Sequence, residues 1–201
     1  MQKIDTIAAL EALYDAPSGG SIDKVTPHLT PAYRGWIEAS RFAVLSTVGP
    51  EGTDASPRGD DGPVARVLDD RTLALPDWRG NNRLDSLRNI VADGRVSLMF
   101  FVPGSTNVVR INGAAKITLD ADLLAFFGRG EVLPRTVIVI RVDEVYFQCA
   151  RAILRSRLWS GVDESAGIPS AGDMLRDATE GAVDAAAYDA AWPGRVAGSM
   201  W

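Results

Sequence analysis

Hydrophobic and polar positions follow two periods along the chain, one typical of strands and one of helices. Segments rich in Val, Ile, Leu, Phe and Thr, bounded by Gly, Pro, Asn or Asp, predict strands at 42–48, 53–57, 64–68, 72–76, 95–102, 107–119 and 135–150. The turn Gly49-Pro50-Glu51-Gly52 predicts a sharp reversal after the first of them. Six or seven short strands, mostly consecutive, favour a closed antiparallel barrel.

Helical spacing of apolar residues appears at the two ends of the chain and between the strands. It predicts helices at 4–14, 32–40, 81–93 and 120–130, and further helices in the Ala-rich tail after Gly161. The segment 81–93 places Leu84, Leu87, Ile90 and Val91 on one face. The pattern divides the chain into N-terminal helices (1–40) that pack on the barrel, the barrel (41–160) and a helical tail of the same domain (161–201).

Length and charge narrow the class of protein. A chain of 201 residues with 46% hydrophobic and 23% charged residues is expected to fold as one globular domain. The formal net charge of −5 argues against non-specific nucleic-acid binding. The N-terminal segment carries Asp5 and Glu11 within its apolar stretch, unlike a signal peptide, and no apolar run is long enough to span a membrane. We therefore expect a cytoplasmic protein without membrane partners.

The residues that commonly bind metals or act as nucleophiles are scarce. Cys149 is the only cysteine and His28 the only histidine, so no cluster with metal-ligand spacing exists and no metal site is predicted. No histidine base lies near Cys149 in the sequence. A buried small hydrophobe is therefore the expected role of Cys149, rather than a catalytic thiol.

The segment from Pro76 to Asn89 carries the clearest chemical signal. A strand ends at Pro76-Asp77, a turn containing Gly80 follows, and a helix is predicted to begin near Asn81 or Asn82, since Asn is a favourable N-cap residue. The free N–H groups of a first helical turn attract anions, and Arg83 adds a cation at the same place. This outlines a phosphate site, although an ordinary capped helix with a solvated Arg83 has the same pattern.

Four features together resemble the FMN-binding split barrel of the pyridoxamine 5′-phosphate oxidase superfamily. They are FAVLSTVGPEG from residue 42, TDASPRGD from 53, TLALPDWRGNNRLDSLRN from 72, and RVSLMFFVPG from 95 leading to RINGAAKIT. The segment VYFQCARAILRSRLW (145–159) resembles the closing strand and helix of a bacterial subgroup of FMN-dependent enzymes in that superfamily. The likeness spans residues 41–160.

The resemblance implies a mainly β fold with peripheral helices: a six-stranded antiparallel Greek-key split barrel. It also implies a homodimer with FMN at the interface. The family's phosphate-binding pair falls on Asn82 and Arg83, of which only Arg83 keeps the cation, and either Arg58 or Arg66 corresponds to a second phosphate-binding arginine. Pro76 and Asp77 would lie beside the ribityl chain and ring, with Asn81 shaping the same contacts.

Two further residues, Arg110 and Gln148, are expected near the flavin ring, and the motif at 56–60 has more than one interpretation. Strand alternation places Val108, Arg110 and Asn112 on one face, so Arg110 either tunes the flavin ring or forms a surface ion pair. Gln148 falls where the oxidase places a tryptophan over the flavin. The motif Ser56-Pro-Arg-Gly-Asp60 is read as a phosphate contact through Arg58, as a polar wall of the substrate pocket, or as a turn with an internal Asp–Arg pair.

The sequence therefore predicts an FMN-dependent oxidoreductase that acts on a small-molecule substrate or reductant, with no catalytic side chain assigned. The flavin would supply the redox chemistry and the protein the binding and electrostatics. The carboxy-terminal part of pyridoxamine phosphate oxidase supplies an arginine and a histidine to the substrate phosphate. The segment 150–159 offers Arg151, Arg155 and Arg157 but no histidine, which argues against that activity itself. A non-catalytic flavin-binding or flavin-sensing protein, or a barrel that binds haem or a deazaflavin, are the alternatives.

Overall fold

One antiparallel sheet forms the centre of the molecule. The computed structural model describes residues 1–149 and 151–200, and within them the strand order is β2-β1-β5-β6-β7-β4-β3. The strands are β1 (Phe42–Gly49), β2 (Gly52–Gly59), β3 (Arg66–Val67), β4 (Thr72–Asp77), β5 (Arg95–Phe101), β6 (Asn107–Thr118) and β7 (Thr136–Cys149). Every predicted strand segment contains a strand, the segment 64–68 only at Arg66–Val67, while Ala150 at the end of the segment 135–150 lies outside the described residues. The described sheet has one strand more than the six implied by the resemblance, because the two-residue β3 pairs with β4.

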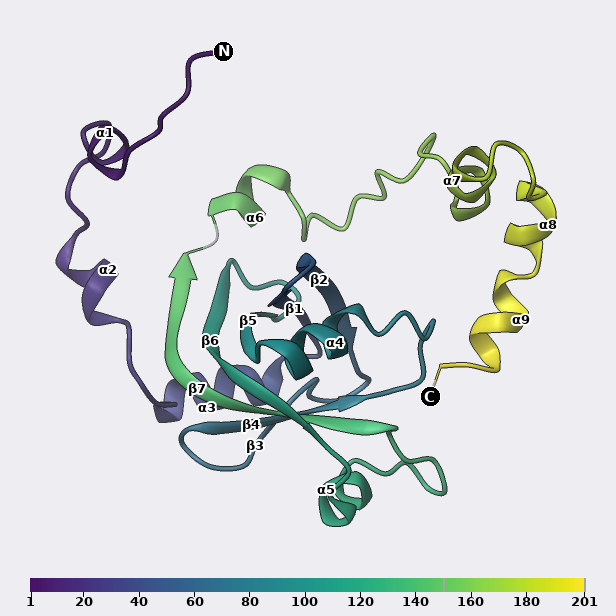
Figure 1. Ribbon diagram of the computed structural model, residues 1–201, viewed down its shortest axis with the longest axis horizontal. Helices are drawn as coiled ribbons and strands as arrows, with labels where there is room; N and C mark the ends of the chain where they lie inside the picture. Colours follow the sequence, from purple (N-terminus) through teal and green to yellow (C-terminus); the bar gives the residue numbers. More distant parts are fainter. Residues whose placement is uncertain (150, 201) are drawn as a thin grey trace.

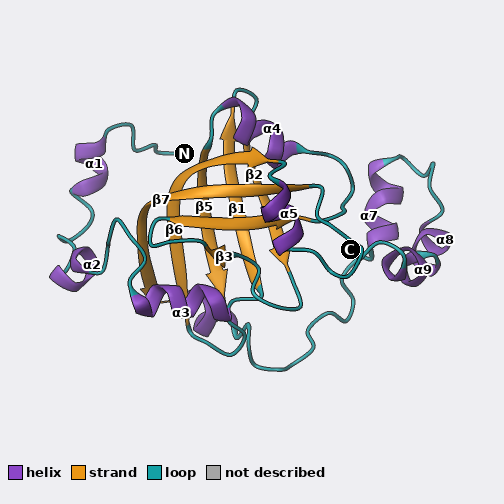
Figure 2. Cartoon of the chain, turned by 90° about the horizontal axis from the view of Figure 1, so that it is seen from below, coloured by secondary structure: helices purple, strands orange, loops and turns teal. Residues whose placement is uncertain are grey.

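The sheet curls over on itself, so that its two ends approach each other (Figure 2). β4 does not pair with β5, the next strand along the chain, but with β7, while β5, β6 and β7 form a meander. Alternate residues of β1 and β5 point inward and are buried, as period-2 patterning requires. The largest fully buried side chains are Phe100, Ile37, Leu45, Leu73, Leu75 and Leu98.

A β-bulge interrupts the pairing of the two longest strands. The register of β6 against β7 shifts between Asn112 and Gly113. Gly113 is fully enclosed there, since a Cβ atom would overlap the carbonyl oxygen of Arg141. Bulges of this kind increase the twist and bend of a strand. The two long strands can therefore curve with the sheet and pair along its whole length.

Helices cover parts of the sheet to different degrees. α3 (Pro31–Ala39) packs on the core through Ile37, and α4 (Asp85–Ala92) through Ile90. α5 (Ala121–Phe126) lies outside the barrel against β7. α1 (Ile7–Glu11) and α2 (Gly19–Asp23) bury no residue and extend away from the sheet (Figure 1). Of the N-terminal helices expected to pack on the barrel, α3 alone buries a residue.

The tail after Gly161 is helical, as predicted, and contains α7 (Ala171–Ala178), α8 (Ala185–Ala190) and α9 (Trp192–Ala197). α6 (Arg151–Ser156) precedes the tail, where the resemblance implied a closing helix. α7 begins with a capping box between Ser170 and Asp173, and its Gly172 N–H donates to Asp189 Oδ1 of α8 at 2.8 Å. The three last helices stand beside the barrel (Figure 1). In residues 1–149 and 151–200, no helix combines the length and apolar character needed to cross a membrane.

Candidate functional site

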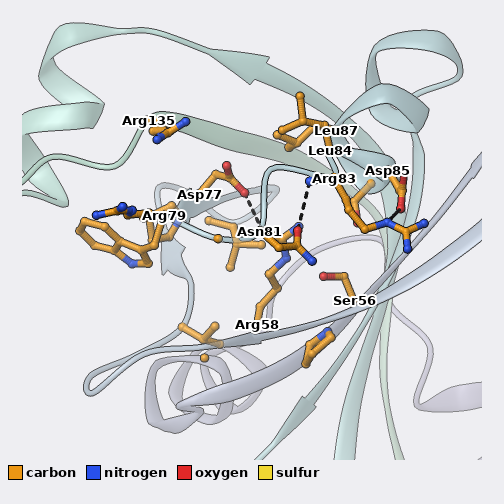
Figure 3. Close-up of a pocket in the computed structure, with 18 of the residues that line it drawn as sticks. Ser56, Arg58, Asp77, Arg79, Asn81, Arg83, Leu84, Asp85, Leu87 and Arg135 are labelled. Carbon is orange, nitrogen blue, oxygen red and sulfur yellow. Dashed lines mark hydrogen bonds and ion pairs between the residues drawn. The ribbon is translucent and has the colours of Figure 1, made fainter. Parts of the chain in front are cut away.

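A cleft of about 1140 Å³ opens between the two ends of the curled sheet. β2 forms one wall, and the end of β4, the loop 78–84 and the first turn of α4 form the other (Figure 3). Pockets that hold small ligands usually measure roughly 300–1,000 Å³, so this cleft has room for a cofactor of nucleotide size. The segment from Pro76 to Arg83 belongs to the stretch in which the sequence outlined a phosphate site. Every residue of this segment lines the cleft.

Four arginines line this cleft: Arg58 from β2, Arg79 and Arg83 from the loop, and Arg135 just before β7. Guanidinium groups bind carboxylates and phosphates through parallel hydrogen bonds, so four of them along one cleft make it a candidate anion site. Acidic residues line the same cleft. Two of them form ion pairs with its arginines: Asp77 with Arg58 and Asp85 with Arg83.

Arg58 is the most enclosed of these cations. Its Nη1 donates to Asp77 Oδ1 at 2.6 Å, and the two side chains are 18% and 14% exposed. Its Nε is buried and has no hydrogen-bond partner. A buried donor of this kind normally has a partner in the protein, in water or in a ligand. Arg58 therefore keeps one donor unused while Asp77 fixes its other edge.

The loop between β4 and α4 differs from the predicted helix start. The helix begins at Asp85 rather than near Asn81 or Asn82, because Asn82 (φ 60°) and Leu84 (φ 63°) adopt left-handed backbone conformations that an α-helix cannot contain. Leu84 is the N-cap residue and makes no side-chain cap. Asn81 closes a local turn instead, accepting from the Arg83 N–H at 3.1 Å. The N-cap prediction for these asparagines was wrong.

Arg83 lies at the mouth of the cleft. Its Nε donates to Asp85 Oδ2 at 2.9 Å, and the arginine side chain is 75% exposed. Figure 3 shows Arg83 and Asp85 together at one side of the loop, while Arg58 rises from the opposite wall. An exposed ion pair contributes little to stability, so the side chain can leave Asp85 at small cost.

Two arginines of the cleft were not among the predicted site residues. Arg135 Nη1 donates to Asn82 Oδ1 at 3.2 Å, and Arg79 Nη1 donates to the carbonyl of Gly198 at 3.4 Å. Arg79 stands inside the motif that carried the prediction and could have been found there. Arg135 lies 53 residues from Asn82, and its place is set by the pairing of β4 with β7.

The Ser56-Pro-Arg-Gly-Asp60 motif forms part of the same wall. Ser56, Arg58 and Asp60 all line the cleft, but the ion pair of Arg58 is with Asp77, so the reading as a turn with an internal Asp–Arg pair was wrong. Asp60 instead accepts from Trp78 Nε1 at 3.1 Å and pairs with Arg129.

Arg129 also anchors the neighbouring Asp61. The hydrogen bond from Arg129 lowers the pKa of the Asp61 carboxyl, and the same contact raises the pKa of Arg129. This ionised contact ties the loop after β2 to the segment that precedes β7.

Arg66, Arg110 and Gln148 do not line the cleft within one copy of the chain. Arg66 lies exposed on β3. Arg110 on β6 donates from Nη1 to Gln148 Oε1 on β7 at 3.3 Å, and its guanidinium lies 5.2 Å from the ring centroid of Tyr146. The predicted residues thus separate into a cleft group, an Arg110–Gln148 pair and a single Arg66.

Cys149 is exposed at the end of β7, so the expectation of a buried residue was wrong. The last three residues of β7 are all exposed, because the strand runs out to the rim of the sheet. In residues 1–149 and 151–200, no three His, Cys, Asp or Glu side chains come together as metal ligands would.

Residues 29–149 match the sequence profile of the family described as pyridoxamine 5′-phosphate oxidase, and this match covers more than half of the chain. The chain belongs to the pyridoxamine 5′-phosphate oxidase family. The match includes α3 and every described strand, and it leaves α1, α2 and the tail from α6 onward outside. Among curated proteins, none matches the chain.

Several solved structures are similar to this chain at low sequence identity. HupZ of Group A Streptococcus is 19% identical with a TM-score of 0.50, over 61% of this chain and 95% of that one. An FMN-binding protein of Syntrophomonas wolfei is 13% identical (TM-score 0.45; 57% and 82% covered). An FAD-binding protein of Mycobacterium smegmatis is 14% identical (TM-score 0.43; 61% and 97% covered). The HupZ likeness supports the same fold for this chain.

Proposed function

We propose that this chain binds FMN in the arginine-lined cleft and acts as an FMN-dependent oxidoreductase on a small molecule. The observation that carries the proposal is the convergence of Arg58, Arg79, Arg83 and Arg135 on one large cleft, in a chain of the pyridoxamine 5′-phosphate oxidase family. The resemblance gave Arg83, together with either Arg58 or Arg66, to the cofactor phosphate; Arg83 and Arg58 line this cleft, and Arg66 does not.

The cleft has the donors that a phosphate monoester needs. Such a group carries nearly two negative charges near neutral pH and must exchange its water for charged donors. Arg58 lines the cleft and keeps a buried Nε without a partner, and Arg83 can turn from the exposed Asp85 toward the ligand. The first turn of α4, which has no side-chain cap, also lines the cleft next to Arg83, and the free N–H groups of such a turn favour anions. These residues fit a phosphate.

Asp77 and Asp85 affect how a phosphate could bind to the arginines of the cleft. Each holds one arginine of the cleft, so a bound phosphate would share Arg58 with Asp77 and compete with Asp85 for Arg83. Asp77 would hold the guanidinium of Arg58 in place at the wall of the cleft. Asp85 would hold Arg83 only while no anion is bound.

A second copy of the chain would complete the site. Arg110 and Gln148 are joined to each other and lie outside the cleft of their own copy. They would meet a flavin only if another chain presented them, which favours the homodimer implied by the resemblance. In that arrangement Pro76, Asp77 and Asn81 would border the ribityl chain, and Arg110 would place a positive charge near the ring.

A bound flavin supplies hydride and electron transfer. The residues of the chain would bind and orient it: arginines at the phosphate, the loop 78–84 along the sugar chain and the curled sheet beneath the ring. No side chain of the cleft is assigned a proton or a covalent bond to substrate, and none is needed for binding.

The test is cofactor loading followed by turnover. The purified protein is titrated with FMN, FAD, riboflavin and haemin, and the loaded protein is then mixed anaerobically with NADH or NADPH before oxygen is admitted. We expect FMN to bind most tightly, with reduction by a nicotinamide donor and reoxidation. Tight flavin binding without reduction by donors would favour the non-catalytic alternative, and failure to bind any flavin would refute the assignment.

A further inference from the structure

Residues 198–200, which follow α9 in the tail, border one side of the arginine-lined cleft. Met200 is one of the residues that line this cleft. In the loop between β4 and α4, Arg79 Nη1 donates to the carbonyl oxygen of Gly198 at 3.4 Å. Figure 1 shows the chain returning from α9 toward this loop. Two parts of the chain that are 119 residues apart therefore meet at the cleft, and we call residues 198–200 the rim segment.

The helices of the tail pack on one another. α7 packs against α8, and α8 against α9. Residues 157–170, all within the described part of the chain, lead to α7 without a helix or strand, and Trp159 Nε1 donates to the carbonyl oxygen of Ser105 at 2.9 Å. Among the residues that the structure describes, the bond from Arg79 is the one hydrogen bond between residues 160–200 and the barrel or its loops. The rim segment can therefore leave the cleft while the helices of the tail stay folded.

The hydrogen bond that holds the rim segment is a weak one for an arginine. Its length of 3.4 Å exceeds the usual range of about 2.7–3.2 Å, and its acceptor is an uncharged carbonyl. Arg58 and Arg83 instead pair with carboxylates of the cleft. Within residues 1–149 and 151–200, Arg79 forms no ion pair, and its side chain is exposed. Because a hydrogen bond to a phosphate is roughly twice as strong as one to a neutral acceptor, an anion in the cleft would take the Arg79 guanidinium from Gly198.

We propose that Arg79 is a latch, which holds the rim segment across the cleft while no anion is bound and releases it when a phosphate group takes the guanidinium. Arg79 then contacts the ligand only in the released state, and this difference shifts the equilibrium between the two states. Binding of the phosphate end of a cofactor would open the side of the cleft that Met200 borders, where a substrate can enter. The latch rests on the proposed function only in requiring an anion in the cleft. Arg79 is a positioning residue, because it acts on the segment and on no reacting atom.

A spin label on the rim segment measures this release in the full chain. Cys149→Ser removes the only cysteine, and Met200→Cys then provides a single thiol for a nitroxide label. The matched control carries the label on α7 through Met174→Cys, since the side chains of Met200 and Met174 are 57% and 60% exposed. In electron paramagnetic resonance spectra, a docked label gives a restricted component and a released label gives a mobile one.

Without ligand, Arg79→Ala should reduce the restricted component at position 200 about threefold, as expected for the loss of one hydrogen bond. Arg88→Ala, at an exposed position of α4 outside the cleft, should leave it unchanged. With Arg79 present, inorganic phosphate should reduce the restricted component more than chloride at equal ionic strength, because phosphate can accept two parallel hydrogen bonds from a guanidinium. FMN should act like phosphate, and riboflavin, which lacks the phosphate, should not. The label at position 174 should report no change in any of these samples.

Three results would overturn the latch. An equal restricted component with Arg79 and with Arg79→Ala would show that other contacts hold the rim segment. A label that becomes more restricted with phosphate or FMN would show that the segment closes over the ligand. A spectrum that neither phosphate nor FMN changes would show that no anion displaces Gly198 from Arg79. Quenching of flavin fluorescence in the same samples reports FMN binding. Its absence would refute the proposed function, and the ligand-free and phosphate spectra would still decide whether the latch exists.

Discussion

Arg58 and Asp77 join two strands that are not neighbours in the sheet. The Nη1–Oδ1 distance is 2.6 Å, and the pair links β2, at one end of the strand order, to β4 near the other end. Both side chains are largely buried. The ion pair therefore bridges the opening of the curled sheet from inside the cleft, and it couples the shape of the barrel to the orientation of a cleft arginine.

Asp77→Asn is expected to lower the free energy of unfolding by about 1–2 kcal/mol, because Arg58 loses its charged acceptor in a partly enclosed site. The freed guanidinium should then accept an external anion. We expect added inorganic phosphate to raise the Tm of this variant more than that of the wild type. Asp143→Asn, which removes an exposed pair with Arg141 at 3.1 Å, is the control and should change stability little. If phosphate raises the Tm of Asp77→Asn by no more than it raises the Tm of Asp143→Asn, Asp77 does not control an anion site.

Arg83→Ala is expected to weaken FMN binding by about 2 kcal/mol, or roughly 30-fold, through loss of a charge-assisted contact to the phosphate. Riboflavin has no phosphate, so its weaker binding should be unchanged by this substitution. Arg88→Ala, on an exposed position of α4 outside the cleft, is the control. Isothermal titration with both flavins measures the difference. The same loss for riboflavin as for FMN would mean that Arg83 acts through the loop and not through the phosphate.

Strand positions could be predicted from the sequence because burial in a sheet alternates residue by residue. β1 and β5 show this alternation in the structure, and the resemblance supplied their order. The start of α4 could not be predicted, because the asparagines that favour a cap are overridden by left-handed conformations at Asn82 and Leu84. The preference of asparagine for a helix N-cap is worth only about 1 kcal/mol. The backbone path that joins β4 to α4 therefore decides where the helix begins.

The cleft could be predicted only where its residues are close in the sequence. Pro76 to Arg83 form one continuous wall, and the motif identifies it. Arg135 reaches Asn82 through the pairing of distant strands, which no local pattern records. Cys149 was misplaced for a related reason: the apolar pattern of β7 gives no sign that its last three side chains are exposed, although the strand stays paired with β6 there.

Stability at acid pH should depend on the turn between α4 and β5. Arg95 donates to Asp93 there and lowers the pKa of that carboxyl from 3.8 to about 2. A lowered folded-state pKa stabilises the protein above the ordinary value and loses that effect as the pH falls toward 2. In Asp93→Asn, the denaturation midpoint should therefore fall less steeply between pH 4 and 2 than in the wild type. Arg95→Gln should behave alike, and an unchanged slope in both would exclude this pair as a source of acid sensitivity.

Gly113→Ala tests whether the β-bulge holds the two long strands together. A Cβ atom at this position would overlap the carbonyl oxygen of Arg141, and backbone there cannot move without disturbing the β6–β7 pairing. We expect a loss of about 3 kcal/mol in the free energy of unfolding, typical of overpacking in a core. Gly35→Ala is the matched control, since its Cβ in α3 would meet nothing within 4 Å and should stabilise the helix by about 0.5–1 kcal/mol. Urea denaturation of both variants measures the contrast, and a mild effect at Gly113 would show that the bulge can relax.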